Sequence, residues 1–208
     1  PRVIEAEQVT DVKQHKVTLT GKLDKFYDGG ALWLDLETEG GQTLRVEQVR
    51  WTVEAPETIR PTAVTICTMN RADDCLKNLQ ALAADVSSLD TLDAIYVADQ
   101  GTDLVESRDG FEQVVKDLGE KLHYIKQPNL GGAGGFTRGL YEVAGHTATA
   151  HANVLFMDDD VLLEPDLVIR MTAFSNRAAN PIIVGGQMLN LFHPNQLHVG
   201  AEYARLNT

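Results

Sequence analysis

The alternation of hydrophobic and polar positions changes character near Pro61. Before this residue, short runs such as 31–37 and 43–49 alternate apolar and polar side chains, and Gly-rich turns separate them. A period of two is typical of β-strands, and Gly-rich turns are typical of antiparallel connections. Residues 1–60 are therefore predicted to form a small antiparallel β module, although the pattern leaves open whether its sheet closes.

After Pro61 the pattern predicts strands that alternate with helices. The helix over 111–118 is predicted to turn Val114, Val115 and Leu118 inward, and the one that opens at Glu164-Pro165 to align Leu167, Met171 and Phe174. Such alternation predicts an α/β fold, a mostly parallel sheet with helices on both faces. The first helix, started by Asn70 or Asp73, is predicted to bury Cys75, Leu76, Leu79, Leu82 and Val86. A further helix is expected over 136–144, and strands over 62–68, 94–98, 123–125, 152–157 and 182–186.

Composition narrows the functional classes. The 208 residues are 43% hydrophobic and carry a net charge of −12, which argues against nucleic acid as a partner. With only two cysteines, a reducing compartment is favoured. The sequence shows no run of about 18 apolar residues and no signal peptide, so no membrane span is expected. The start at Pro1 and the stop at Thr208 indicate an excised fragment.

Three acidic residues follow the fourth predicted strand, in Phe156-Met157-Asp158-Asp159-Asp160. Carboxylates this close repel one another unless a cation offsets their charge, and oxygen ligands suit Mg²⁺ or Mn²⁺. Side chains alternate in an extended segment, so Asp158 and Asp160 are expected to point together. The alternative is a solvated acidic turn or a helix cap.

Polar residues also follow the first two predicted strands. Asn70 and Arg71 open a helix, where free N–H groups and a guanidinium suit phosphate; a plain helix cap by Asn70 is the alternative. Asp99 follows the second strand and could accept a hydrogen bond from a uracil or ribose, or simply form a turn. Ligands of α/β sheets bind beyond the carboxyl ends of the strands, which is where these residues fall.

A glycine-rich segment, Asn129 to Gly139, follows the third predicted strand. Glycines allow a backbone to approach a ligand closely, which suits a pyrophosphate. The segment lacks the Gly-Lys-Ser/Thr of a Walker A loop, and it follows the wrong strand for a Rossmann fingerprint. A flexible loop is the alternative reading.

This order of motifs resembles the GT-A fold of family 2 glycosyltransferases. The stretches Thr-Met-Asn-Arg-Ala-Asp-Asp, Asn-Leu-Gly-Gly-Ala-Gly-Gly-Phe-x-Arg-Gly and Phe-Met-Asp-Asp-Asp-Val are similar to one branch, the galactofuranosyltransferases that polymerise actinobacterial cell-wall galactan. The resemblance is strongest from Pro61 to about Gly186. It implies an N-terminal β-sandwich over 1–60 and a GT-A nucleotide-sugar-binding domain over 61–208.

Site roles follow from the resemblance by position. Asp158 and Asp160 would hold Mn²⁺ or Mg²⁺, Arg71 and Asp99 would contact uridine, and Asn129 would face the ribose and diphosphate. The sequence departs from many family members at Gln100, where a second acid is usual. The implied nucleotide-sugar site comprises Thr68, Asn70, Arg71, Asp99, Asn129, Gly131, Gly132 and Asp159.

The implied reaction is inverting transfer of galactofuranose from UDP-galactofuranose to a lipid-linked galactan acceptor. The general base and a third metal ligand, a histidine, are expected beyond Thr208, so the fragment is expected to bind donor and metal with little turnover; His193 and His198 are read as ordinary surface or core residues. The resemblance implies a cytoplasmic protein and leaves room for peripheral association with the inner face of the plasma membrane and for a homo-oligomer. The alternatives are a family 2 enzyme with another nucleotide sugar, a non-catalytic carbohydrate-binding or assembly module, and a nucleotidyltransferase.

Overall fold

The computed structural model describes residues 2–10, 13–22, 32–41, 43–145 and 152–199. Its contacts divide the chain into two compact units, Pro1–Thr52 and Val53–Thr208. The division falls earlier than residue 60, where the sequence places it. Arg60 lies in the second unit, where the side chain of Asn176 holds its backbone: Asn176 Oδ1 accepts from the Arg60 N–H (2.8 Å), and Asn176 Nδ2 donates to the Arg60 carbonyl (2.9 Å).

The described residues of the first unit contain no helix and no hydrogen-bonded strand. Both alternating sets of side chains are exposed there, including Trp33, Leu34 and Trp51, so the period-two pattern buries no face. Hydrogen bonds in the described part of this unit involve side chains; the Thr20 N–H, for example, donates to the Glu5 carboxylate. The predicted β-sandwich over 1–60 therefore remains a prediction.

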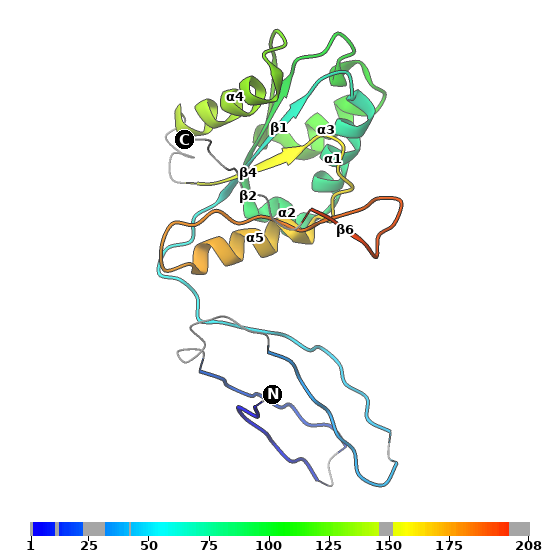
Figure 1. Cartoon of the computed structure of the whole chain (residues 1–208), viewed down its shortest axis with the longest axis vertical. Helices are drawn as coiled ribbons and strands as arrows, with labels where there is room; N and C mark the ends of the chain where they lie inside the picture. The colour runs from blue at the N-terminus through cyan, green and yellow to red at the C-terminus, as the bar shows by residue number, and fades with distance from the viewer. Residues whose placement is uncertain (1, 11–12, 23–31, 42, 146–151, 200–208) are drawn as a thin grey trace, which may run out of the picture. The chain divides into compact units, whose positions relative to one another are not determined.

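The second unit is an α/β domain whose strands and helices alternate along the chain (Figure 1). Two single-turn 3₁₀ helices span Val105–Ser107 (η1) and Gly119–Lys121 (η2). The remaining elements are β1 (Thr62–Thr68), α1 (Ala72–Ala84), α2 (Val86–Thr91), β2 (Leu92–Asp99), α3 (Phe111–Leu118), β3 (Leu122–Lys126), α4 (Gly131–Gly145), β4 (Asn153–Asp158), α5 (Asp166–Arg177), β5 (Met188–Leu189) and β6 (Leu197–Val199).

Four parallel strands form the sheet in the order β3-β2-β1-β4. The central strand β1 is rich in β-branched residues and is buried on both faces, as expected for a strand that helices cover from both sides. The predicted α/β class and the first four predicted strands are confirmed. The short strands β5 and β6 form a separate antiparallel pair.

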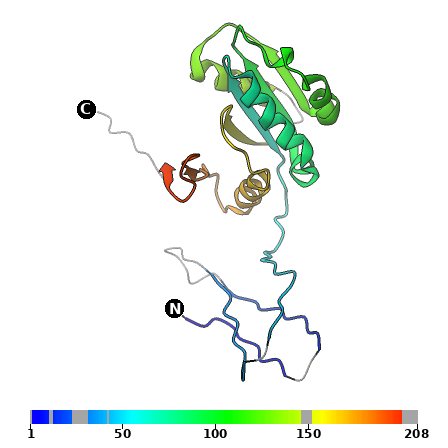
Figure 2. The same ribbon diagram turned by 90° about the vertical axis from the view of Figure 1, so that its right-hand side faces the viewer.

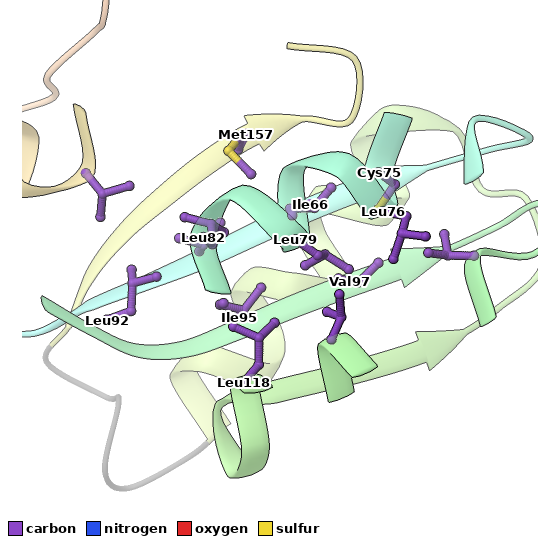
Figure 3. Packing of buried hydrophobic residues seen from close by; sticks show 14 of the residues in the cluster. Ile66, Cys75, Leu76, Leu79, Leu82, Leu92, Ile95, Val97, Leu118 and Met157 are labelled. Carbon is purple, nitrogen blue, oxygen red and sulfur yellow. The ribbon is translucent and has the colours of Figure 1, made fainter. Parts of the chain in front are cut away.

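Each face of the sheet has its own apolar core. On one face, Val64 and Ile66 of β1 pack with Leu79 and Leu82 of α1 and Ile95 of β2 (Figure 3). Figures 1 and 2 show α1 lying along this side of the sheet. On the other face, a smaller cluster joins β-strand residues to α4 and consists of Ala63, Ala94, Tyr96 and Val143. Burial of side chains of this size contributes roughly 1.5–3 kcal/mol each, so the larger cluster dominates the stability of the domain.

Helix α4 begins five residues earlier than predicted, inside the glycine-rich segment. A Cβ on Gly135 would lie 2.1 Å from Cys67 Sγ, and a Cβ on Gly139 would lie 2.6 Å from Thr65 Cβ. These two glycines therefore let the helix lie directly on β1. The expectation of a glycine loop before residue 136 is wrong because the glycines serve close packing of a helix against a strand.

Several local predictions are also wrong. The predicted strand over 182–186 is absent: these residues are unpaired, and Ile183 is fully exposed. Helix α5 buries Val168 and Thr172, while Leu167 and Phe174 stay exposed. Two other residues that are predicted to face inward have exposed side chains, Val86 in α2 and Val115 in α3.

Candidate functional site

The sheet register brings four sequence segments to one edge. Thr68 of β1 pairs with Asp99 of β2, Asp99 pairs with Lys126 of β3, and Cys67 pairs with Asp158 of β4. All four strands are parallel, so the segments that follow them leave the sheet on the same side. This carboxyl edge gathers the four motifs that the sequence singles out, at the place where α/β sheets bind ligands.

The acidic turn lies at the end of β4. Asp158 and Asp160 are exposed, and Asp159 between them is half-buried. Asn78, a buried residue of α1, donates from Nδ2 to the Asp159 carbonyl at 2.9 Å and so fixes the turn to the helix. Sequence reasoning missed Asn78; its signal was a polar residue between apolar positions on the inward face of α1.

The electrostatics of the turn are uneven. Burial raises the pKa of Asp159, and repulsion from Asp160 adds to the rise, while the Thr68 hydroxyl and the Arg71 guanidinium oppose it. Arg71 NH1 lies 3.4 Å from Asp160 Oδ2, and Arg71 also donates to Asp74 at 2.9 Å. The structure thus brings Arg71 and the acidic turn together, which the sequence alone could not show.

Asn70 does not cap α1. The helix N-cap is Arg71, without a side-chain capping bond, and Asn70 has a φ of 55° in the left-handed region. Its Oδ1 instead accepts hydrogen bonds from the N–H groups of Thr102 (2.8 Å) and Asp103 (3.0 Å). The alternative of a plain helix cap by Asn70 is therefore wrong, because the amide oxygen points to the loop after β2.

Asp99 is buried, with 1% of its surface exposed, and its carboxylate is occupied within the protein. Oδ1 accepts from the Gly101 N–H at 3.0 Å; Oδ2 accepts from the Val105 N–H at 2.9 Å and from the Tyr124 hydroxyl at 2.5 Å. Burial and the bond to Asp99 raise the pKa of Tyr124, which therefore stays a donor. In this arrangement the carboxylate organises the loop that follows it.

Gln100 links this loop to the start of α4. Its Nε2 donates to the Gly131 carbonyl (3.0 Å) and its Oε1 accepts from the Leu130 N–H (2.8 Å). Asn129 Oδ1 accepts from the Gly131 N–H at 2.9 Å, and Gly131 has a φ of 71°. Asn129, Gly131 and Gly132 are exposed, so the first turn of α4 presents its backbone to solvent beside the loop.

The donor set at this edge suits a hard divalent cation, because Asp158 and Asp160 are exposed and offer carboxylate oxygens. Within the described ranges, no group of three or more His, Cys, Asp and Glu side chains could hold a metal ion. Two carboxylates would leave most positions of an octahedral ion to other oxygen ligands, such as those of a diphosphate and water.

Of the described helices, none is long and apolar enough to cross a membrane.

Comparisons with known proteins identify the family of the chain. Residues 56–206 match the family model described as glycosyltransferase like family 2. The chain is 41% identical over 181 residues to galactofuranosyltransferase GlfT2 of Mycolicibacterium smegmatis and 41% identical over 180 residues to GlfT2 of Mycobacterium tuberculosis. These alignments cover 86% of the chain, which spans 27% and 28% of the two relatives.

Among solved structures, the chain is similar to the mannosyltransferase PcManGT from Pyrobaculum calidifontis in complex with GDP-Man and Mn²⁺. It is 22% identical with a TM-score of 0.39, and the match covers 64% of this chain and 37% of that one. A likeness of this size leaves the assignment to the sequence matches. Because the family model covers most of the chain, including every strand of the parallel sheet, this protein belongs to the family 2 glycosyltransferases.

Proposed function

We propose that the chain carries the donor-binding part of a metal-dependent, inverting galactofuranosyltransferase that uses UDP-galactofuranose and extends a galactan. The observation that supports it most is the 41% identity to two galactofuranosyltransferases across 86% of the chain. The gathering of the acidic turn, Arg71 and the exposed start of α4 at one sheet edge supports it independently. A lipid-linked acceptor and self-association belong to the same proposal.

The diphosphate would lie between two sources of positive potential. The Gly131 N–H donates to Asn129, but Gly132 and Ala133 are exposed in the first turn of α4, where N–H groups lack acceptors within the helix, which suits an anion. Arg71 is half-exposed and adds a full charge whose guanidinium can bind phosphate oxygens in a bidentate way. Both features lie at the carboxyl edge, so an acidic protein can still bind an anionic nucleotide there.

Asp158 and Asp160 would hold Mn²⁺ or Mg²⁺. The ion, when bound, would stabilise negative charge on the leaving diphosphate as a Lewis acid. Asp159, whose raised pKa follows mainly from burial, is held by Asn78 through its carbonyl, and this fixes the turn between the two ligands. Inversion would further require a carboxylate that accepts the proton of the attacking hydroxyl.

The test is calorimetric titration of UDP with and without Mn²⁺. We expect Mn²⁺-dependent binding that is lost in the double variant Asp158→Ala/Asp160→Ala. The matched control is Asp90→Ala/Glu120→Ala, which removes the same charge from exposed positions next to the amino ends of β2 and β3. Equal binding by both double variants would contradict the assigned metal site.

The donor sugar is tested by competition. UDP-galactofuranose should displace bound UDP more effectively than UDP-glucose or UDP-N-acetylglucosamine does. A preference for another nucleotide sugar would retain the family and overturn the proposed donor. Absence of UDP binding under every condition would overturn the donor-binding proposal for this chain.

A further inference from the structure

The loop after β2 is held by side chains rather than by regular secondary structure. Five of its backbone N–H groups have a partner: that of Gln100 donates to the Thr68 carbonyl, and those of Gly101 and Val105 donate to Asp99. The remaining two, of Thr102 and Asp103, donate to Asn70 Oδ1. Two side chains thus fix the path of residues 100–105: Asp99 at the end of β2, and Asn70 in the β1–α1 connection.

We propose that Asn70 is a positioning residue, which clamps the 100–105 loop at the carboxyl edge and acts on the donor through that loop. This inference rests on the proposed donor site for its functional part. Its structural part rests on the contacts alone. Asn70 is exposed, yet its amide oxygen is occupied by two backbone N–H groups and lies 3.4 Å from the Thr102 hydroxyl.

The backbone at both ends of the clamp is specialised for it. Asn70 has a φ of 55°, a conformation that Asn and Gly adopt more readily than other residues. A Cβ on Gly101 would lie 2.7 Å from Asn70 Oδ1 and 2.8 Å from Asn70 N, so only glycine lets the loop approach this closely. The contact between Asn70 and Gly101 is therefore a close steric fit across two connections of the sheet, next to the hydrogen bonds that Asn70 accepts from Thr102 and Asp103.

A second link secures the same loop from α1. Arg108 donates from Nε to Asp73 at 2.8 Å and from NH1 to Asp103 at 2.7 Å. Asp103 is thus held twice, through its N–H by Asn70 and through its carboxylate by Arg108. The Asp103 pKa is lowered by the bonds from Arg108, which keeps this carboxylate charged.

The clamp reaches the predicted diphosphate site through Gln100. The side chain of Gln100 bonds Leu130 N and the Gly131 carbonyl, so the loop and the first turn of α4 move together. Release of the loop from Asn70 should therefore loosen the start of α4, where we place the diphosphate. The clamp gives the edge a fixed shape before the donor arrives, which reduces the ordering needed on binding.

The structural part is tested by hydrogen exchange on the protein without ligand. Asn70→Gly keeps the backbone conformation and removes the acceptor; we expect the Thr102 and Asp103 amides to lose protection by on the order of tenfold. Asn70→Asp retains an oxygen acceptor and tolerates the same φ, so protection should be kept. Amides of Ile95 and Val97 in β2 serve as the internal control. Unchanged protection in Asn70→Gly would overturn the clamp.

The functional part is tested by UDP titration with Mn²⁺ on Asn70→Gly, Gly101→Ala and the double variant. Gly101→Ala displaces the loop without changing Asn70. If Asn70 acts through the loop, both single variants weaken UDP binding by at least about tenfold and the double variant is no worse than either, a non-additive result. Additive losses, or a loss only in the Asn70 variants, would show direct contact with the donor and overturn the positioning role.

The two proposals fail in different ways. Hydrogen exchange is measured without UDP, so it decides the clamp even if the wild-type protein binds no UDP. Absence of UDP binding by the wild-type protein would overturn the proposed function, and with it the functional part of the inference. Retained UDP affinity in Asn70→Gly, together with lost protection of Thr102 and Asp103, would overturn the functional part alone.

Discussion

The packing of α4 on the central strand gives the sharpest stability prediction, the substitution Gly139→Ala. Gly139 is buried, and an added Cβ would lie 2.6 Å from Thr65 Cβ and 2.7 Å from Thr65 Cγ2. Carbon atoms in contact prefer about 3.5–4.0 Å, so the helix must move away from the strand by about 1 Å. Thr65 cannot move in compensation, because β1 is hydrogen-bonded on both sides.

The shift would disturb the smaller core, Ala63, Ala94, Tyr96 and Val143. Overpacking of a buried site typically costs about 1–3 kcal/mol, against a gain of up to about 1 kcal/mol when alanine replaces glycine within a helix. We therefore expect a net loss of about 1–2 kcal/mol for Gly139→Ala. Because domains are stable by only about 5–15 kcal/mol, this loss is readily measured.

The matched control is Gly132→Ala in the same helix. Apart from the adjacent residues and the backbone of α4 itself, no described atom lies within 4 Å of the Cβ that this change adds, so only the gain in helix propensity remains. Urea denaturation followed by circular dichroism should show Gly139→Ala below wild type and Gly132→Ala at or slightly above it. Equal or greater stability for Gly139→Ala would refute the reasoning that glycine is needed for close approach of α4.

Two further predictions concern buried polar and ionisable groups. Asp99→Asn should destabilise the protein by about 1–3 kcal/mol in urea denaturation, because one amide cannot accept all the hydrogen bonds that the carboxylate receives from Gly101, Val105 and Tyr124. The control Asp90→Asn makes the same change at an exposed position and should have little effect. Equal denaturation midpoints for the two variants would contradict the assigned contacts. Burial raises the pKa of Cys75 to about 12, so the unfolded chain loses this proton first and the free energy of unfolding falls as pH rises from about 9 towards 12. The fall between pH 8 and pH 10 should be shallower in Cys75→Ala than in wild type, and parallel pH profiles would exclude this thiol as a contributor.

The sequence by itself determined the architecture of residues 61–177 to a large degree. Period-two and helical patterns are local, and four buried strands and the helices between them follow from apolar runs such as Thr62–Thr68. The order of motifs after the strands was local as well, and parallel strands necessarily bring such motifs to one edge. That is why the fold, and the edge of the sheet at which the motifs meet, could be predicted without coordinates.

The tertiary structure decided what the individual site residues contact. Asn70 and Asp99 are polar residues at strand ends. The sequence pattern at such a position is the same whether the side chain contacts a ligand, caps a helix or clamps a loop. Only the packed fold shows that their oxygens are occupied by the 100–105 backbone. The same holds for Gly135 and Gly139. Their glycine-rich segment predicts a loop, and only the close packing against β1 shows that it is part of a helix. Hydrogen-bond partners and close approaches join residues tens of positions apart, and a local pattern carries no information on them.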